Sequence, residues 1–136
     1  MDFDKDVGRV QRLMAASIAG VNRRQAILET LYIKSGDKII DVGCGAGQLL
    51  GHLAKAVGEN GEVIGLDPSA DQLAQAKSSC SDFSNITFLE KGADETALPD
   101  DSCDAATSTQ ALEYIPDVDA ALSEITRVLR PGGSLV

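Results

Sequence analysis

The stretch KIIDVGCGAGQ, residues 38–48, decides the fold of this chain. Its first half is apolar and partly β-branched without polar alternation, which predicts a strand buried in a parallel sheet. Gly43, Gly45 and Gly47 follow at alternate positions. Because glycine accepts unusual backbone dihedrals and lets a ligand approach closely, the pattern predicts a tight turn into a helix over about residues 48–57. The start of that helix would direct its N–H groups and positive dipole end towards a ligand.

Short apolar runs alternate with helical periodicity along the rest of the chain. The expected strands cover residues 38–42, 62–67, 86–90, 103–107 and 134–136, and the expected helices cover residues 2–31 (in two pieces), 48–57, 70–80 and 117–129. This alternation predicts the α/β class, with right-handed βαβ units and a parallel sheet covered by helices on both faces. We expect a single domain over residues 1–136, with N-terminal helices in 1–35 and the sheet core in 36–136.

Composition narrows the function classes. The chain has 136 residues, 43% hydrophobic residues and a net charge of −9. These values allow a real core and disfavour nucleic-acid binding, which needs clustered basic residues. A small neutral or cationic ligand fits the acidic balance better. No apolar run is long enough to span a membrane, and the charged N-terminus lacks the apolar core of a signal peptide, so the expected compartment is the cytoplasm.

The chain contains three cysteines, Cys44, Cys80 and Cys103, at distant positions. Neither a disulfide framework nor a metal motif is expected from this spacing. Each is interpreted as a small buried residue in a reducing compartment, with soft-metalloid or thiol chemistry as the less favoured alternative.

In an open parallel sheet the ligand binds at the carboxyl ends of the strands. The glycine turn, Asp67, the pair Ala93 and Asp94, and residues 107–113 all follow such ends. We therefore expect four distant stretches of sequence to converge on one rim.

The spacing of these groups points to one kind of ligand. Asp67 lies about two dozen residues after the first glycine, close to the offset of a ribose-binding carboxylate, although an Asp here could instead cap the next helix. The glycines form G-x-G-x-G, which is neither a dinucleotide fingerprint nor a phosphate loop. Asp41, just before the turn, would repel a pyrophosphate but could hold an ammonium group. S-adenosylmethionine has a ribose and a positive charge and carries no phosphate.

Four motifs resemble class I S-adenosylmethionine-dependent methyltransferases, in the small-molecule branch (type 11) that includes the ubiquinone and menaquinone enzymes. They are DVGCGAG (41–47), GLDPS (65–69), GADETALP with DDSCD (92–104) and LSEITRVLRPGG (122–133). The resemblance covers about residues 36–136 and implies a Rossmann-like sheet of strand order 3-2-1-4-5. The cofactor-binding residues that it implies are Asp41, Gly43, Cys44, Gly45, Gly47, Asp67, Pro68, Ala93, Asp94 and Gln110.

The family also implies a role for most of these positions. The three glycines would line the methionine part of the cofactor, with Asp41 near its amino group. Asp67 would bind the ribose hydroxyls. Ala93 and Asp94 would meet the adenine, with Asp94 at the exocyclic amine. Gln110 would face the methionine end and the transferred methyl group.

The expected activity is methyl transfer from S-adenosylmethionine to a small-molecule acceptor by in-line displacement. Because the donor is already activated, catalysis can rest on proximity and orientation, and no catalytic base is assigned. Glu113 and Tyr114 are candidates that could equally serve packing and capping. His52, the single histidine, is interpreted as a surface residue of its helix.

Complete family members continue through strands 6 and 7, whereas this sequence ends within strand 5. The hypothesis is therefore a fragment whose strand 5 edge frays or is covered by a partner, for example in a homodimer. Two alternatives stay open: a non-catalytic cofactor-binding module that needs a partner, and, less favoured, a nicotinamide-dependent oxidoreductase. The acceptor is also open among quinone-type, lipid, small-metabolite and arsenical compounds.

Overall fold

The computed structural model describes residues 33–108 and 115–136 of the chain. Within these ranges the fold is a five-stranded parallel sheet with the order β3-β2-β1-β4-β5. Its strands are β1 (Lys38–Val42), β2 (Glu62–Leu66), β3 (Ile86–Leu89), β4 (Cys103–Thr107) and β5 (Leu129–Leu135). The predicted α/β class and strand order are confirmed. The predicted N-terminal helices, Gln110, Glu113 and Tyr114 lie outside the described residues.

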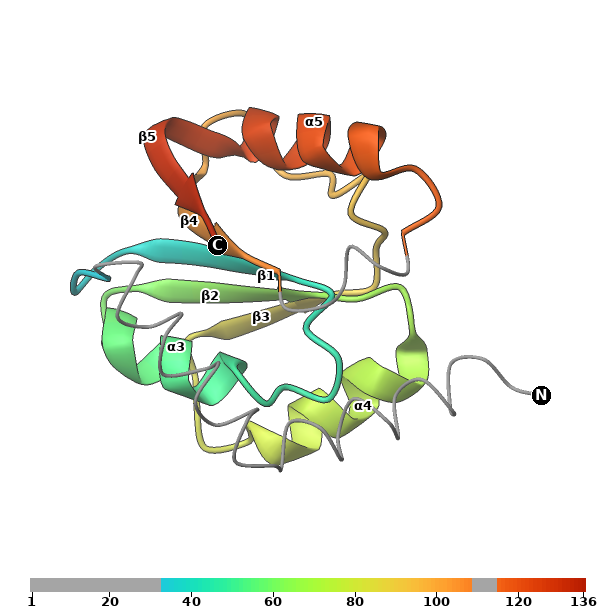
Figure 1. Cartoon of the computed structure of the whole chain (residues 1–136). Coiled ribbons are helices and arrows are strands. Elements are labelled where there is room, and N and C mark those ends of the chain that lie inside the picture. The colour runs from blue at the N-terminus through green and yellow to red at the C-terminus, as the bar shows by residue number, and fades with distance from the viewer. Residues whose placement is uncertain (1–32, 109–114) are drawn as a thin grey trace.

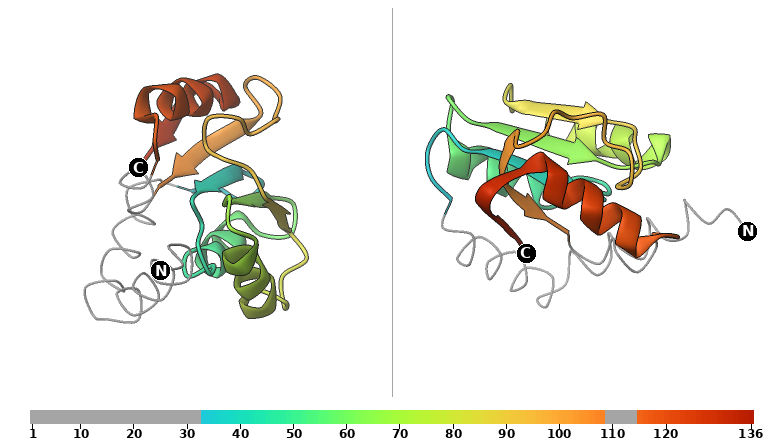
Figure 2. Two further views of the ribbon diagram at one scale, coloured as in Figure 1. Left: turned by 90° about the vertical axis from the view of Figure 1, so that its right-hand side faces the viewer. Right: turned by 90° about the horizontal axis from the view of Figure 1, so that it is seen from above.

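Helices cover both faces of the sheet, as predicted. They are α3 (Leu50–Val57), α4 (Ala70–Ser79) and α5 (Val118–Val128). Figures 1 and 2 show α3 and α4 on one face and α5 on the other. Each follows a strand and returns the chain to the next parallel strand, which is the right-handed βαβ connection that the sequence pattern requires.

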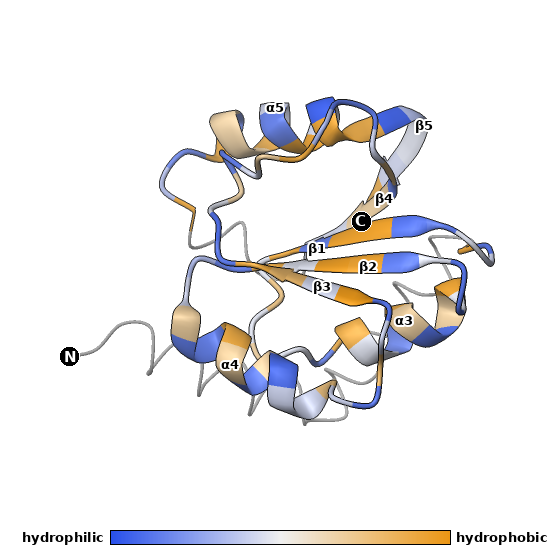
Figure 3. Cartoon of the chain, turned by 180° about the vertical axis from the view of Figure 1, so that it is seen from behind, coloured by the Kyte–Doolittle hydropathy of each residue, from blue (hydrophilic) through white to orange (hydrophobic). Residues whose placement is uncertain are grey.

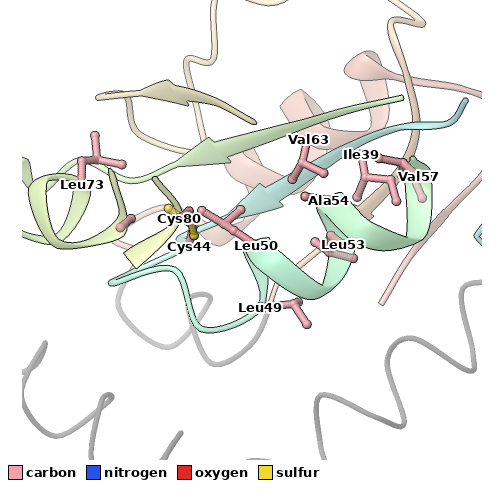
Figure 4. Close-up of a cluster of buried hydrophobic side chains, with 12 residues drawn as sticks. Ile39, Cys44, Leu49, Leu50, Leu53, Ala54, Val57, Val63, Leu73 and Cys80 are labelled. Atoms are coloured by element: carbon pink, nitrogen blue, oxygen red, sulfur yellow. The ribbon is translucent and has the colours of Figure 1, made fainter. Parts of the chain in front are cut away.

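Two apolar clusters hold these layers together. The cluster under α3 and α4, drawn in Figure 4, comprises Ile39, Cys44, Leu49, Leu50, Leu53, Ala54, Val57, Val63, Leu73, Ala76, Cys80 and Ala105. The cluster under α5 comprises Ile40, Val42, Ile64, Leu66, Ala93, Cys103, Ala106, Ala121, Ile125 and Val128. Alternate residues of β1 therefore face opposite clusters, which is why its sequence is apolar without a polar face. Figure 3 shows the same hydrophobic character along β1 and β2.

The weak fourth strand, rich in Ala and Thr, is nevertheless central. Ile39, Ile40 and Asp41 of β1 stand in register with Ala105, Ala106 and Thr107 of β4. The last three residues of β4 are buried. Tertiary burial compensates for the low strand propensity of alanine here.

Two helix boundaries differ from the prediction. The helix after the glycine turn begins at Leu50 and not at Gln48, because the turn that contains Gly47 (φ +89°) continues through Gln48 to Leu49, the N-cap residue. The last helix ends at Val128 and not at Leu129, which is extended (ψ 136°) and already pairs with Cys103. Strand β5 thus starts earlier than predicted and bulges before Ser134 returns to register with Ala105.

None of the helices within the described ranges combines the length and apolar character needed to cross a membrane.

Candidate functional site

The glycine turn is bound to the end of β2 through its own backbone. Gly43 N and Cys44 N both donate to the carbonyl oxygen of Leu66, at 2.7 and 2.9 Å. Gly45 N donates to Asp67 Oδ2 at 3.0 Å. These N–H groups are therefore used within the protein, and what the turn offers a ligand is closely approachable backbone.

All three glycines of the motif have left-handed backbones, with φ of 68° at Gly43, 58° at Gly45 and 89° at Gly47. Side chains other than glycine rarely adopt this region, which explains the alternate spacing. Gly47 has a second constraint, since a Cβ atom there would lie 3.2 Å from Cα of Ala76 in α4. The turn is consequently fixed in shape and packed against the helix that follows β2.

Asp67 directly follows β2 and is 9% exposed. Its Oδ2 accepts from Gly45 N, and its Oδ1 accepts from Ser69 N at 2.9 Å. The side-chain cap of α4 is Ser69, whose Oγ accepts from Gln72 N at 3.3 Å. Asp67 therefore orients the capping residue without being the cap, and exposed Pro68 lies between the two. The carboxylate is held in one orientation by donors from two separate loops.

Asp41 lies near the carboxyl end of β1, on the same rim, and is only 1% exposed. Thr107 Oγ1, from the paired position of β4, donates to Asp41 Oδ1 at 2.7 Å. Burial raises the pKa of Asp41 from 3.8 to about 7, and the negative charge of Asp67 adds to this, while the Thr107 hydrogen bond acts against it. Two acidic side chains thus influence each other where a ligand is expected.

The loop after β3 contains the remaining described candidates. Ala93 is buried in the α5-side cluster, whereas Asp94 is exposed. The Asp94 side chain lies close to Gly92, since a Cβ atom on Gly92 would be 2.7 Å from Asp94 Oδ1. The structure thus brings the glycine turn, Asp41 and Asp67 into contact or electrostatic influence. Ala93 shares a buried cluster with Val42 and Leu66, at the ends of β1 and β2, and Asp94 follows it in the chain without a described contact to the other candidates.

The sequence prediction places Thr107 and Ser108 at this rim, within residues 107–113, but gives neither a role, and it does not mention Gln72. The structure gives Thr107 a role, because it stands in register with Asp41. Gln72 Oε1 and Ser108 Oγ are buried without a hydrogen-bond partner among the described residues. Gln72 belongs to the first turn of α4 and Ser108 directly follows β4. Ser108 therefore lies just after the carboxyl end of β4, whereas Gln72 lies in the helix that follows β2.

The cysteines are buried and the histidine lies on the surface, as the sequence predicts. Cys44, Cys80 and Cys103 are all buried and free of disulfides. Burial, followed by the charges of Asp41 and Asp67, raises the pKa of the Cys44 thiol, which disfavours the reactive thiolate. His52 is exposed on α3, as predicted.

Comparison with known proteins agrees with this geometry. Residues 39–133 match the family described as methyltransferase domain. The demethylmenaquinone methyltransferase of Staphylococcus saprophyticus is 38% identical over 113 residues, which are 83% of this chain and 48% of that protein. The chain thus spans about half of that relative's length.

Two solved structures extend the comparison. A SAM dependent methyltransferase from Aquifex aeolicus is 27% identical, with a TM-score of 0.74 over 79% of this chain and 58% of its own. The [4+2]-cyclase SpnF is 31% identical, with a TM-score of 0.79 over 86% of this chain and 43% of its own. The family match covers well over half of the chain, and the motifs that carry the resemblance are the ones that build the rim. The chain therefore belongs to the methyltransferase domain family, in agreement with its resemblance to the class I enzymes.

Proposed function

We propose that this chain binds S-adenosylmethionine at the rim and serves methyl transfer to a small-molecule acceptor. The observation that carries the proposal is the hydrogen bond from Gly45 N to Asp67 Oδ2. It joins the glycine turn and the acidic strand end, which are 22 residues apart in the sequence, into one unit. Such a unit can bind the ribose of S-adenosylmethionine at Asp67 and the attached methionine part at the glycine turn.

The residues present fit this cofactor in charge and in hydrogen-bonding capacity. A carboxylate can accept about four hydrogen bonds, which suits Asp67 to the pair of hydroxyls on a ribose. Neighbouring Asp41 and Asp67 disfavour a phosphate and suit a cation. Ser108 Oγ, just after β4, and Gln72 Oε1, in the first turn of α4, are buried without a hydrogen-bond partner among the described residues, and a polar ligand could satisfy them.

The assignments from the resemblance extend this fit. Gly43, Gly45 and Gly47 would lie along the methionine part of the cofactor, with Asp41 near its ammonium group. Ala93 and Asp94 would meet the adenine, with Asp94 at its exocyclic amine, and Gln110 would face the methionine end and the methyl group. Cys44 and Pro68 are further cofactor-binding candidates without a specific role.

When bound, S-adenosylmethionine supplies an activated methyl group. The contribution of the chain is then to bind, to orient and to exclude water. No described residue is assigned as a base.

The acceptor is proposed as a class. The Staphylococcus relative is named for demethylmenaquinone, so a quinone-type acceptor is the first to test. Lipids, other small metabolites and arsenicals remain candidates.

Calorimetric titration of the 136-residue chain with S-adenosylmethionine tests the cofactor. The wild-type chain should bind, and Asp67→Ala should weaken binding by about a hundredfold or more, because hydrogen bonds to charged groups contribute about 1.5–3 kcal/mol each. Asp71→Ala is the matched control, since Asp71 is an exposed acid in the first turn of α4 and its loss changes the net charge equally.

Absence of binding by the wild-type chain at millimolar cofactor would refute the proposal. A parallel titration with NAD distinguishes the nicotinamide-dependent alternative, which predicts NAD binding in place of S-adenosylmethionine binding. Equal losses in Asp67→Ala and Asp71→Ala would show that general charge, and not the rim, governs the affinity.

A second candidate function is cofactor binding without methyl transfer by this chain. The observation that favours it is the likeness to a protein described as a [4+2]-cyclase, which shares the fold under the name of a different reaction. The two candidates differ in one measurement: transfer of a labelled methyl group to a demethylated quinol. Binding without transfer to any acceptor would favour the second candidate.

Two broader expectations belong with the proposal. Among the described strands β5 lies at one edge of the sheet, and Leu135 is 39% exposed, so pairing of β5 with a second copy is the proposed mode of self-association. Light scattering over a range of concentrations would test it. The three free cysteines are consistent with the cytoplasm as the proposed compartment.

A further inference from the structure

The loop between β3 and β4 is attached to α5 by a polar network. Glu124 of α5 accepts two hydrogen bonds from Thr96, one from its backbone N and one from its Oγ1, each at 2.8 Å. Thr96 is 1% exposed and Glu124 is partly buried, so bulk solvent reaches this contact only from the Glu124 side. A single carboxylate therefore fixes both the backbone and the side chain of one loop residue.

Arg127, one turn further along α5, completes the network. Its Nε donates to Glu124 Oε1 at 2.7 Å. One of its terminal nitrogens donates to the carbonyl oxygen of Leu98 at 2.7 Å, and the other donates to Asp100 Oδ1 at 2.6 Å. Arginine has five donors in a rigid planar arrangement, so it can fix several acceptors at once. The pair thus holds the loop at Thr96, Leu98 and Asp100.

The backbone inside this network is strained. Ala97 lies between the first two anchor points and has φ 64°, a left-handed conformation that is unfavourable for alanine. Across it, Leu98 N donates to Thr96 Oγ1 at 3.2 Å. Such strain persists only where the surroundings determine the conformation, and it gathers at functional loops. Here the surroundings are Glu124 and Arg127.

The held segment directly follows the proposed adenine contacts. Ala93 and Asp94 lie two to three residues before Thr96, and the turn between them is short, since Glu95 N donates to the carbonyl oxygen of Gly92 at 3.2 Å. Ala93 also belongs to the cluster that includes Ala121 and Ile125 of α5. The position of Asp94 therefore depends on how the loop is attached to α5. Directional hydrogen bonds fix that attachment more specifically than apolar packing alone.

From this geometry we propose that Glu124 and Arg127 are positioning residues that set the preference for adenine by holding the loop of residues 93–100 in shape. Neither residue needs to touch the cofactor. The inference rests on the proposed function, because it assigns a specificity role to the supports of the same site.

The experiment compares two ligands that differ only in the base. S-adenosylhomocysteine carries the exocyclic amine of adenine, and S-inosylhomocysteine has a carbonyl oxygen in its place. Calorimetry gives the ratio of their dissociation constants for the wild-type chain and for Glu124→Gln and Arg127→Ala. Asp119→Asn and Arg130→Ala are the controls, because Asp119 is an exposed acid of α5 and Arg130 pairs with Asp104 of β4 and not with the loop.

The wild-type chain should prefer the adenine compound. Glu124→Gln and Arg127→Ala should reduce that preference by about tenfold, which corresponds to about 1.4 kcal/mol, while the two controls keep the wild-type ratio. Hydrogen exchange at the amides of Thr96 and Leu98 should become faster only in the first two variants.

Three outcomes would overturn the inference. In the first, the wild-type chain binds both ligands equally. In the second, the variants lose affinity for both ligands in parallel, as a general loss of stability would cause. In the third, the ratio is unchanged although hydrogen exchange shows a loosened loop. Failure of the wild-type chain to bind S-adenosylhomocysteine at all would instead refute the proposed function, and the inference would fall with it.

Discussion

Asp41 shows at the scale of a single residue how position changes chemistry. Its carboxyl group is buried near Asp67 and accepts a hydrogen bond from the hydroxyl of Thr107. These surroundings disfavour the charged form, so the pKa rises to about 7. An ordinary surface aspartate is fully ionised at neutral pH. Without a bound cation beside it, Asp41 is only partly ionised at the same pH.

Cofactor binding should therefore release a proton from Asp41. A nearby ammonium group favours the charged carboxylate and lowers its pKa. With a starting pKa of about 7, release should be close to one proton at pH 6, about half a proton at pH 7 and near zero at pH 8. Titrations in buffers of different ionisation enthalpy measure this number.

Asp41→Asn is the control for this prediction. Its side-chain oxygen can still accept from Thr107, so the fold should survive while the pH-dependent release disappears. A proton release that is equal in the variant and the wild-type chain would show that another group titrates.

The glycine turn is the element on which the site depends, and two glycines allow its packing to be measured. Gly36 and Gly47 have nearly the same φ, 92° and 89°. A Cβ atom at Gly36 would meet nothing within 4 Å, whereas one at Gly47 would meet Ala76 Cα at 3.2 Å and Cys80 Sγ at 3.3 Å. The pair thus separates backbone strain from steric contact.

Gly36→Ala should lower the free energy of unfolding by about 1–2 kcal/mol, the cost of a left-handed alanine. Gly47→Ala should lower the free energy of unfolding by about 1–3 kcal/mol more than Gly36→Ala does, because α4 has to move away from the turn. Urea denaturation of both variants measures the difference. Equal losses would mean that α4 yields without cost and that the turn is not tightly packed.

For the whole molecule, the attachment of the loop to α5 makes stability depend on pH. The pKa of Glu124 is lowered from 4.5 to about 2, and the largest cause is its hydrogen bonding to Arg127. Because the folded pKa is depressed, this contribution is fully present above pH 4.5 and is lost as the pH falls towards 2. Solvent screening limits its size to about 1 kcal/mol.

Glu124→Gln should accordingly be less stable than the wild-type chain by about 1 kcal/mol near neutral pH, with the two converging as the pH falls below about 4. Urea denaturation at several pH values measures this convergence. Asp119→Asn, at an exposed position of the same helix, should differ from the wild-type chain by less at every pH. A constant difference between Glu124→Gln and the wild-type chain would contradict the role of the carboxylate charge.

Strands β1 and β4 agree with their predicted bounds, Lys38–Val42 and Cys103–Thr107, because apolar runs between turn residues are strong local signals. The helix boundaries at Leu50 and Val128 were not predictable in the same way. They depend on the dihedral of Gly47 and on the pairing of Leu129 with Cys103, and the second of these involves a distant part of the chain.

The sequence by itself determined the class of the fold, the strand order through its resemblance, and the convergence of Asp41, Asp67 and the glycine turn on one rim. Periodicity and glycine spacing are local, and the topology of a parallel sheet then brings strand ends together. Only the tertiary structure decided how the rim is connected. The bond from Thr107 to Asp41 spans 66 residues and the bond from Thr96 to Glu124 spans 28, and no local pattern encodes which side chains meet across such separations.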